Sequence, residues 1–212
     1  MKHFLILTFA FFTIFANAQT EIDTTEIEQE IEINDVVDLL SVPGPVEFGA
    51  GNELFLTWSK QQSNTFSTQQ YLPRDERIED FNQLLTFSFF NKEIDIEYAV
   101  RDKMDQVQKK IDKDKFGKVN LTENPDGTEF IIDYTFSDDR DENLPFVEYT
   151  LERFKKYEKS FLILSYSKRI YGDFKAAYKT ISKQRDQLMT TMIEYKIPKI
   201  TLINQQDLRR KK

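Results

Sequence analysis

The chain has 212 residues, of which 40% are hydrophobic and 31% are charged, and its formal net charge is −7 at neutral pH. This composition predicts a globular domain with a packed core and argues against a basic, nucleic-acid-binding face. The chain has no cysteine and one histidine, His3, so disulfides, Cys/His zinc sites and cysteine nucleophiles are excluded.

The first eighteen residues resemble a secretory signal peptide. A short basic start precedes an apolar run from Phe4 to Phe15, and the small residues Ala16 and Ala18 lie just before Gln19. We therefore expect cleavage between Ala18 and Gln19 and export to the periplasm or beyond. The alternative, an N-terminal membrane anchor, is disfavoured because the apolar run is short for a membrane span. Cleavage would also remove the only histidine, which leaves the mature protein without an imidazole for catalysis.

Residues 19–41 are predicted to form an acidic, disordered tail. No Lys or Arg occurs between Gln19 and Ser59, whereas ten acidic residues do. Ile27, Ile31 and Ile33 alternate with acids, so the tail could instead add as a strand to a partner's sheet edge. Calcium binding is a further alternative, although the acids do not have the spacing of a calcium loop.

A single domain is expected from residue 42 to residue 198, beginning at the rigid segment Val42-Pro43-Gly44-Pro45. Residues 54–58 predict a strand with Leu54, Leu56 and Trp58 on one face, followed by a polar turn over 61–64 and a return strand over 65–71.

Two helices are predicted next. In the first, residues 77–90, apolar side chains recur at three- and four-residue steps. In the second, Asp95 is the expected N-cap, and an apolar stripe runs from Ile96 to Ile111.

The sharpest pattern is a β-hairpin over residues 119–136. Apolar and polar side chains alternate on both sides of the turn Asn124-Pro125-Asp126-Gly127, where Gly127 can adopt a positive φ. Strands over 146–154 and 161–168 complete an antiparallel meander of four strands. A long helix should follow from the N-cap Asp173 to about Lys196, and a basic tail over 199–212 ends the chain.

This order of elements predicts an α+β fold: an antiparallel sheet of about six strands packed against two or three helices. The order weakly resembles that of Mog1/PsbP-like domains. The chain also resembles a family of uncharacterised secreted proteins from Bacteroidota in four blocks, namely 42–45, Tyr71-Leu72-Pro73, 123–129 and 167–172. This resemblance implies secretion and a fold but carries no activity.

Four residues are candidates for a binding site. Trp58 and Tyr71 lie on predicted strands, and Arg169 and Tyr171 lie where the last strand meets the final helix. An aromatic ring with an arginine could bind a peptide or a small anion. Alternatively, Trp58 and Tyr71 belong to the core and Tyr171 supports the helix. No glycine-rich phosphate loop or nucleophile motif occurs, and we expect no cofactor and no metal.

These observations favour an exported, non-enzymatic binding or accessory domain of the cell envelope, with an envelope protein or a peptide as partner. Two alternatives remain open. One is a glycosidase-like hydrolase that uses acids of the loop at Asp138, Asp139, Asp141 and Glu142, which could also hold calcium weakly. The other is a purely structural envelope protein.

Overall fold

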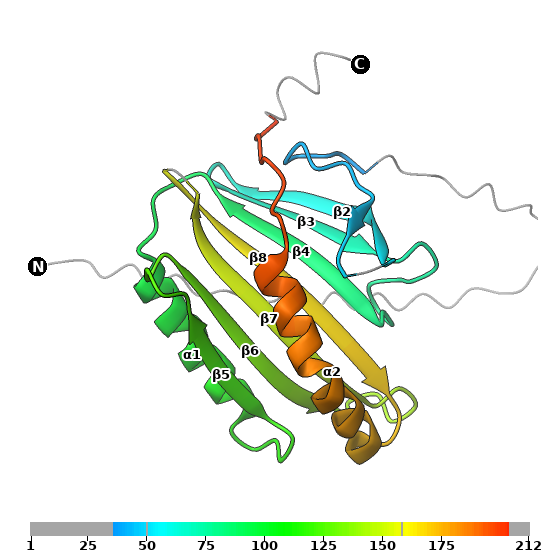
Figure 1. The fold of residues 1–212 in the computed structure, drawn as a ribbon. Helices are drawn as coiled ribbons and strands as arrows, with labels where there is room; N and C mark the ends of the chain where they lie inside the picture. Colours follow the sequence, from blue (N-terminus) through cyan, green and yellow to red (C-terminus); the bar gives the residue numbers. More distant parts are fainter. Residues whose placement is uncertain (1–35, 50, 158, 204–212) are drawn as a thin grey trace, which may run out of the picture. The chain divides into compact units, whose positions relative to one another are not determined.

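The computed structural model describes residues 36–49, 51–157 and 159–203. These residues form eight strands and two helices (Figure 1). In chain order the elements are β1 (Val46–Glu47), β2 (Glu53–Ser63), β3 (Phe66–Leu72), β4 (Gln83–Phe90), α1 (Ile96–Ile111), β5 (Lys118–Glu123), β6 (Glu129–Asp138), β7 (Phe146–Tyr157), β8 (Ser160–Tyr171) and α2 (Phe174–Glu194).

All eight strands belong to one antiparallel, half-barrel sheet with the order β1-β2-β3-β4-β8-β7-β6-β5. Pairing of β4 with β8 joins the first four strands to the meander of the last four. The described part of the chain is thus mostly β, and the prediction of about six strands packed against two or three helices was wrong. The predicted four-strand meander is confirmed.

The error arose at residues 77–90, where a helix was predicted and the structure has a turn followed by β4. Leu85, Phe87 and Phe89 are buried, whereas Thr86 and Ser88 between them are half-exposed, so the burial pattern has a period of two. Apolar residues at both faces of a strand also satisfy a three- and four-residue spacing, which made the pattern ambiguous. The element order behind the resemblance to Mog1/PsbP-like domains is changed accordingly.

A register shift in β2 between Leu56 and Trp58 changes the face of the strand on which Trp58 lies. Leu54 is fully buried on the side of the sheet that α2 covers, whereas the Trp58 side chain is 39% exposed. The prediction that Leu54, Leu56 and Trp58 share one face was therefore wrong. The strand also continues to Ser63, through part of the predicted turn.

The hairpin and the second helix are confirmed. In the turn between β5 and β6, Gly127 has a φ of 68°, and the Asn124 side chain accepts hydrogen bonds from the backbone N–H groups of Thr128 (2.9 Å) and Glu129 (2.8 Å). Asp95 caps α1 by accepting a hydrogen bond from the Tyr98 N–H at 3.0 Å.

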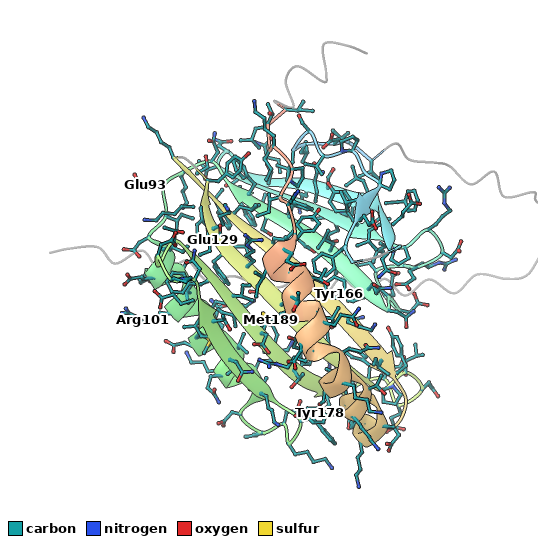
Figure 2. The ribbon with its side chains drawn as sticks, in the orientation of Figure 1. Glu93, Arg101, Glu129, Tyr166, Tyr178 and Met189 are labelled. Carbon is teal, nitrogen blue, oxygen red and sulfur yellow. The ribbon has the colours of Figure 1, made fainter. Side chains whose placement is uncertain are left out.

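The two helices lie on opposite faces of the sheet. Ile132 and Tyr134 of β6 face α1, and Ile131 of the same strand belongs to the core under α2. Figure 2 shows Tyr178 and Met189 on α2, where this helix crosses the meander. Both faces of β6 are covered, so the side chains that point to either face are mostly buried.

Segments outside the predicted domain bounds also pack on the α2 side. Leu39 and Leu40 are buried, and so is Ile200. The Thr201 N–H donates to the Leu40 carbonyl at 3.0 Å, which pairs the two ends of the domain. The predicted signal peptide with its cleavage site, the rest of the acidic tail (19–35) and residues 204–212 lie outside the described residues.

Candidate functional site

Three of the four candidate residues lie on the face of the sheet that carries α1. Trp58 pairs with Gln70 there, and Arg169 and Tyr171 stand on the same side of β8. Tyr71 lies on the opposite face and is fully buried. Its hydroxyl donates to the Val42 carbonyl at 2.5 Å, and burial raises the pKa of this hydroxyl. Tyr71 is therefore part of the core, as the alternative reading of the sequence predicted.

The register of the strands places a line of polar side chains across this face. Directly opposed residues of antiparallel strands share a face. The cross-strand partners run from β2 through β3, β4 and β8 to β7 as Trp58, Gln70, Thr86, Ser165 and Glu152. We call these five residues the polar row. At strand spacings of about 4.8 Å, the row spans roughly 19 Å from the indole to the carboxylate.

A second line lies beside the polar row, where Thr68 pairs with Ser88. Thr68 is 94% buried, and its hydroxyl oxygen has no hydrogen-bond partner among the described residues. Buried hydroxyls usually have a partner, so this group is an unused donor and acceptor. On the other side of the row, the hydroxyls of Thr150 and Ser167 lie 3.0 Å apart and satisfy each other.

The part of this face near β2, β3 and β4 is open to solvent. On this side of the sheet, α1 packs on β5, β6 and β7. Gln70, Thr86, Ser88 and Ser165 are half-exposed, and Trp58 is more exposed than any of them. We call the surface formed by Trp58, Gln70, Thr86, Ser88 and Ser165 the open face.

Two carboxylates border the open face, and each is held by a basic side chain. Glu152 accepts from Lys103 of α1 at 2.7 Å and from the Tyr134 hydroxyl at 3.2 Å. Burial and the Glu152 charge raise the pKa of Tyr134, which keeps it a neutral donor. Glu148 accepts from Arg169 at 2.8 Å. These pairs neutralise the buried carboxylates and leave uncharged groups along the centre of the row.

Arg169 has a structural role at this border. Its guanidinium lies 3.8 Å from the centre of the Phe81 ring and 4.4 Å from that of Phe146, and it donates to the Glu79 carbonyl at 3.3 Å. The Tyr171 hydroxyl donates to the Phe81 carbonyl at 3.0 Å. Both residues therefore fix the 73–82 turn against β8, so replacing Arg169 should destabilise the fold before it reports on binding.

The opposite face is covered by α2 and the segments near the ends of the domain. Asp133 is almost fully buried and binds Arg185 of α2 through two hydrogen bonds, 2.8 and 2.9 Å long. This pair explains why Arg185 occurs among the apolar residues Ile181, Leu188 and Met192 on the inner side of α2. At the end of the helix, Arg153 donates to three carbonyl groups, those of Met192 (3.0 Å), Ile193 (3.2 Å) and Tyr195 (3.1 Å).

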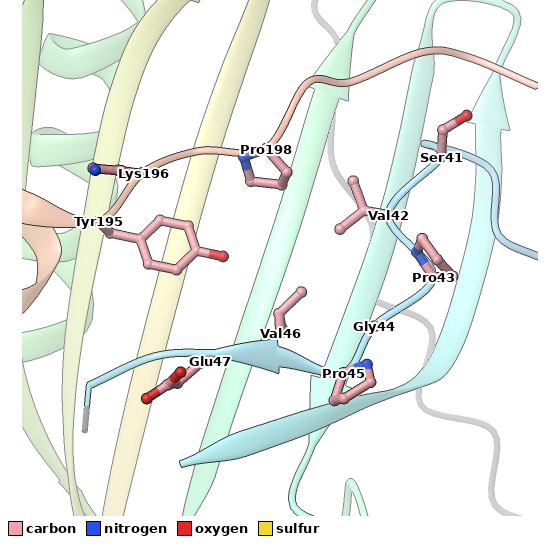
Figure 3. Close-up of a pocket in the computed structure, with 10 residues that line it drawn as sticks. All are labelled: Ser41, Val42, Pro43, Gly44, Pro45, Val46, Glu47, Tyr195, Lys196 and Pro198. Carbon is pink, nitrogen blue, oxygen red and sulfur yellow. The ribbon is translucent and has the colours of Figure 1, made fainter. Parts of the chain in front are cut away.

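A hollow of about 450 Å³ lies on this covered side, between residues 41–47 and residues 195–198 (Figure 3). Tyr195 extends into it from the end of α2 toward the 42–46 segment, and burial raises the pKa of Tyr195 to about 12. Ser41 beside it has a φ of 56°, and its hydroxyl donates to the Thr201 carbonyl at 3.0 Å. The unusual backbone of Ser41 thus serves to join the ends of the domain.

The loop that contains Asp138, Asp139, Asp141 and Glu142 gives little support for a glycosidase-like hydrolase. Asp138 is bound by Arg140, and hydrogen bonds from this guanidinium lower the pKa of the Asp138 carboxyl. A general acid of a glycosidase needs the opposite shift. Asp139, Asp141 and Glu142 are exposed. Within residues 36–49, 51–157 and 159–203, no three acidic or histidine side chains are grouped as metal ligands.

Gln70, Thr86 and Ser165 were missed as candidate residues from the sequence. Their signal is the alternation within 83–90 and 161–168, where Thr86 and Ser165 separate buried apolar residues. Recognising the row also required the strand order, because β4 and β8 are far apart in sequence.

Comparison with known proteins gives a family but no function. The sequence model of an uncharacterised protein family matches residues 40–197, more than half of the chain, and the chain belongs to that family. Neither the curated proteins nor the solved structures contain a match. Neither of the two described helices is long and apolar enough to cross a membrane.

Proposed function

We propose that the protein is an exported, non-enzymatic binding or accessory module of the cell envelope, located in the periplasm or outside the cell. Export is supported by the basic start, the apolar run and the small residues before Gln19. The resemblance to secreted proteins of Bacteroidota is consistent with it. The purely structural and hydrolase alternatives share this location.

The polar row carries the proposal that the open face is the binding surface. An exposed indole, an amide and two hydroxyls stand in one line on a rigid sheet, and the indole lies at the end farthest from α1. Side chains on paired strands keep their relative positions, so they can meet a ligand without a large loss of conformational freedom. A solvated sheet face needs no such arrangement, so binding has to be tested directly.

Export is tested by fractionating cells that express the full chain and sequencing the N-terminus of the recovered protein. The proposal predicts protein beginning at Gln19 in the periplasm or medium. Full-length protein beginning at Met1 in the cytosol would contradict export.

Binding at the open face is tested with a panel of neutral oligosaccharides, acidic oligosaccharides and decapeptides. Every probe that binds is measured again with Trp58→Ala and with Tyr98→Ala, a control in which an aromatic residue is removed from the exposed outer side of α1. We expect Trp58→Ala alone to weaken binding, by about tenfold. Binding that is equally strong in both variants would place the site elsewhere, and no binding by any probe would contradict a binding module of this kind.

A further inference from the structure

The chemistry of the open face points to the class of ligand. We infer that the open face binds a neutral, hydroxyl-rich ligand, that is, an uncharged glycan segment lying along the polar row. This inference rests on the proposed function, because it names the ligand of the same surface.

The first step of the argument is charge. The two carboxylates at the border are bound by Lys103 and Arg169, so neither is available to bind a cation or a basic peptide. Lys60 of β2, which pairs with Thr68 of β3, is an exposed charge beside the row, at the edge of the face. The centre of the row, Gln70, Thr86 and Ser165, has no formal charge. A ligand that matches this surface gains little from a charge of its own.

The second step is hydrogen bonding. Threonine and serine hydroxyls both donate and accept, and the Gln70 amide does the same through its two ends. A glycan presents groups of the same kind, because each hydroxyl is both a donor and an acceptor. Thr68 beside the row is buried, so its hydroxyl is not part of the surface that a ligand would meet.

The third step is the exposed aromatic ring. Trp58 is 39% exposed at the outer end of the row, while most other large aromatic residues on the sheet are buried. The face of an indole offers a broad apolar surface, which can pack against the apolar C–H face of a sugar ring. An extended peptide would bind better at a free strand edge, where its backbone finds partners. A surface with one indole and a line of hydroxyls therefore favours a sugar chain.

The experiment uses a natural probe, because Trp58 is the only tryptophan of the chain. Its fluorescence is titrated in the mature protein with three ligand sets: neutral glucan, xylan and mannan oligosaccharides, acidic polyuronate oligosaccharides, and decapeptides. We expect a saturable change with at least one neutral set, and less than a twofold change in Kd between low and high salt. Acrylamide quenching of Trp58 should fall when the ligand is bound.

Matched variants connect the response to the row. Thr86→Val keeps the shape of the side chain and removes its hydroxyl, and Ser165→Ala does so with a small change in volume. Each should weaken neutral glycan binding by about fivefold. Thr180→Val removes an exposed hydroxyl from α2 on the other face and should leave the Kd unchanged. Circular dichroism checks that each variant is folded.

The outcomes separate the two proposals. A Trp58 response to acidic oligosaccharides or peptides, but to no neutral set, would overturn the ligand class and leave the open face as the binding surface. A Trp58 response to a neutral glycan with the same Kd in both row variants as in the unaltered protein would overturn the assignment of the ligand to the polar row. No response to any set at millimolar concentration would overturn both.

Discussion

Replacing Phe87 by alanine tests the architecture most sharply, because the two interpretations of residues 77–90 give opposite results. In the structure, Phe87 is fully buried on β4 and packs edge-on against Tyr71, with ring centres 5.5 Å apart. In the predicted helix over 77–90, the apolar stripe would consist of Ile78, Phe81, Leu84 or Leu85, and Phe89, and position 87 would lie on the opposite side. The strand therefore predicts a large loss of stability, and the helix predicts a small one.

The magnitude follows from the burial of the side chain. Truncating a fully buried phenylalanine to alanine costs about 3–5 kcal/mol, because apolar contacts are lost and a cavity remains. Loss of the edge-on contact with Tyr71 is part of this cost. In a domain of this size, the midpoint of thermal unfolding should fall by about 10 °C. Urea unfolding followed by circular dichroism measures the free energy directly.

Thr86→Ala is the matched control, since Thr86 is half-exposed on the other face of the same strand. It should change the free energy of unfolding by less than about 1 kcal/mol. If Phe87→Ala is too unstable to purify, Phe87→Leu should still lose about 1 kcal/mol. A loss below 1 kcal/mol for Phe87→Ala would refute the strand assignment.

Three further predictions concern the turn, the border of the open face and pH. Gly127→Ala should cost about 1 kcal/mol, because φ is 68° at this position, and an unchanged urea midpoint would contradict that turn. Arg169→Ala should cost about 3 kcal/mol because it leaves Glu148 buried and unpaired, whereas full stability would show that the pair is not structural. Glu129 is partly desolvated, which raises its pKa, but hydrogen bonds from Lys155 and Arg153 outweigh this, and the pKa is lowered overall. A lowered folded-state pKa means that the stabilisation is complete above the unfolded-state pKa of about 4.3 and is lost as the pH falls through the folded-state value. Glu129→Gln should therefore reduce the dependence of stability on pH below pH 5, and identical acid unfolding curves would contradict this role.

The elements with their own local signals could be predicted from the sequence. The hairpin has Asn124 and Gly127 at positions where the turn requires them, and α1 and α2 have Asp95 and Asp173 as N-caps. Such signals depend on a few neighbouring residues, so the rest of the fold does not alter them.

The remaining features depend on contacts between distant parts of the chain. Ile78, Phe81, Leu85 and Phe89 have the spacing of a helical stripe, whereas Leu85, Phe87 and Phe89 have the spacing of one face of a strand. Only pairing with β3 and β8 decides between the two. A register shift in β2 moved Trp58 to the open face, and no local pattern marks that shift. Arg185 is a polar residue on the inner side of α2, and only its pairing with Asp133 of β6 explains it.

The candidate site could be predicted only in part for the same reason. Trp58 was selected as a candidate ligand-binding residue and lies on an accessible surface. Tyr71 was selected by the same reasoning and is fully buried. The polar row consists of residue types that carry little information one at a time. Their significance arises from the strand order, which brings β4 beside β8.

The most direct test of the central claim is an NMR titration of the mature protein with the neutral oligosaccharide that binds best. If the open face is the binding surface, the amide shifts that change should cluster at Trp58, Gln70, Thr86 and Ser165 on β2, β3, β4 and β8. Changes confined to α2 and residues 195–198, with none on those four strands, would contradict the claim.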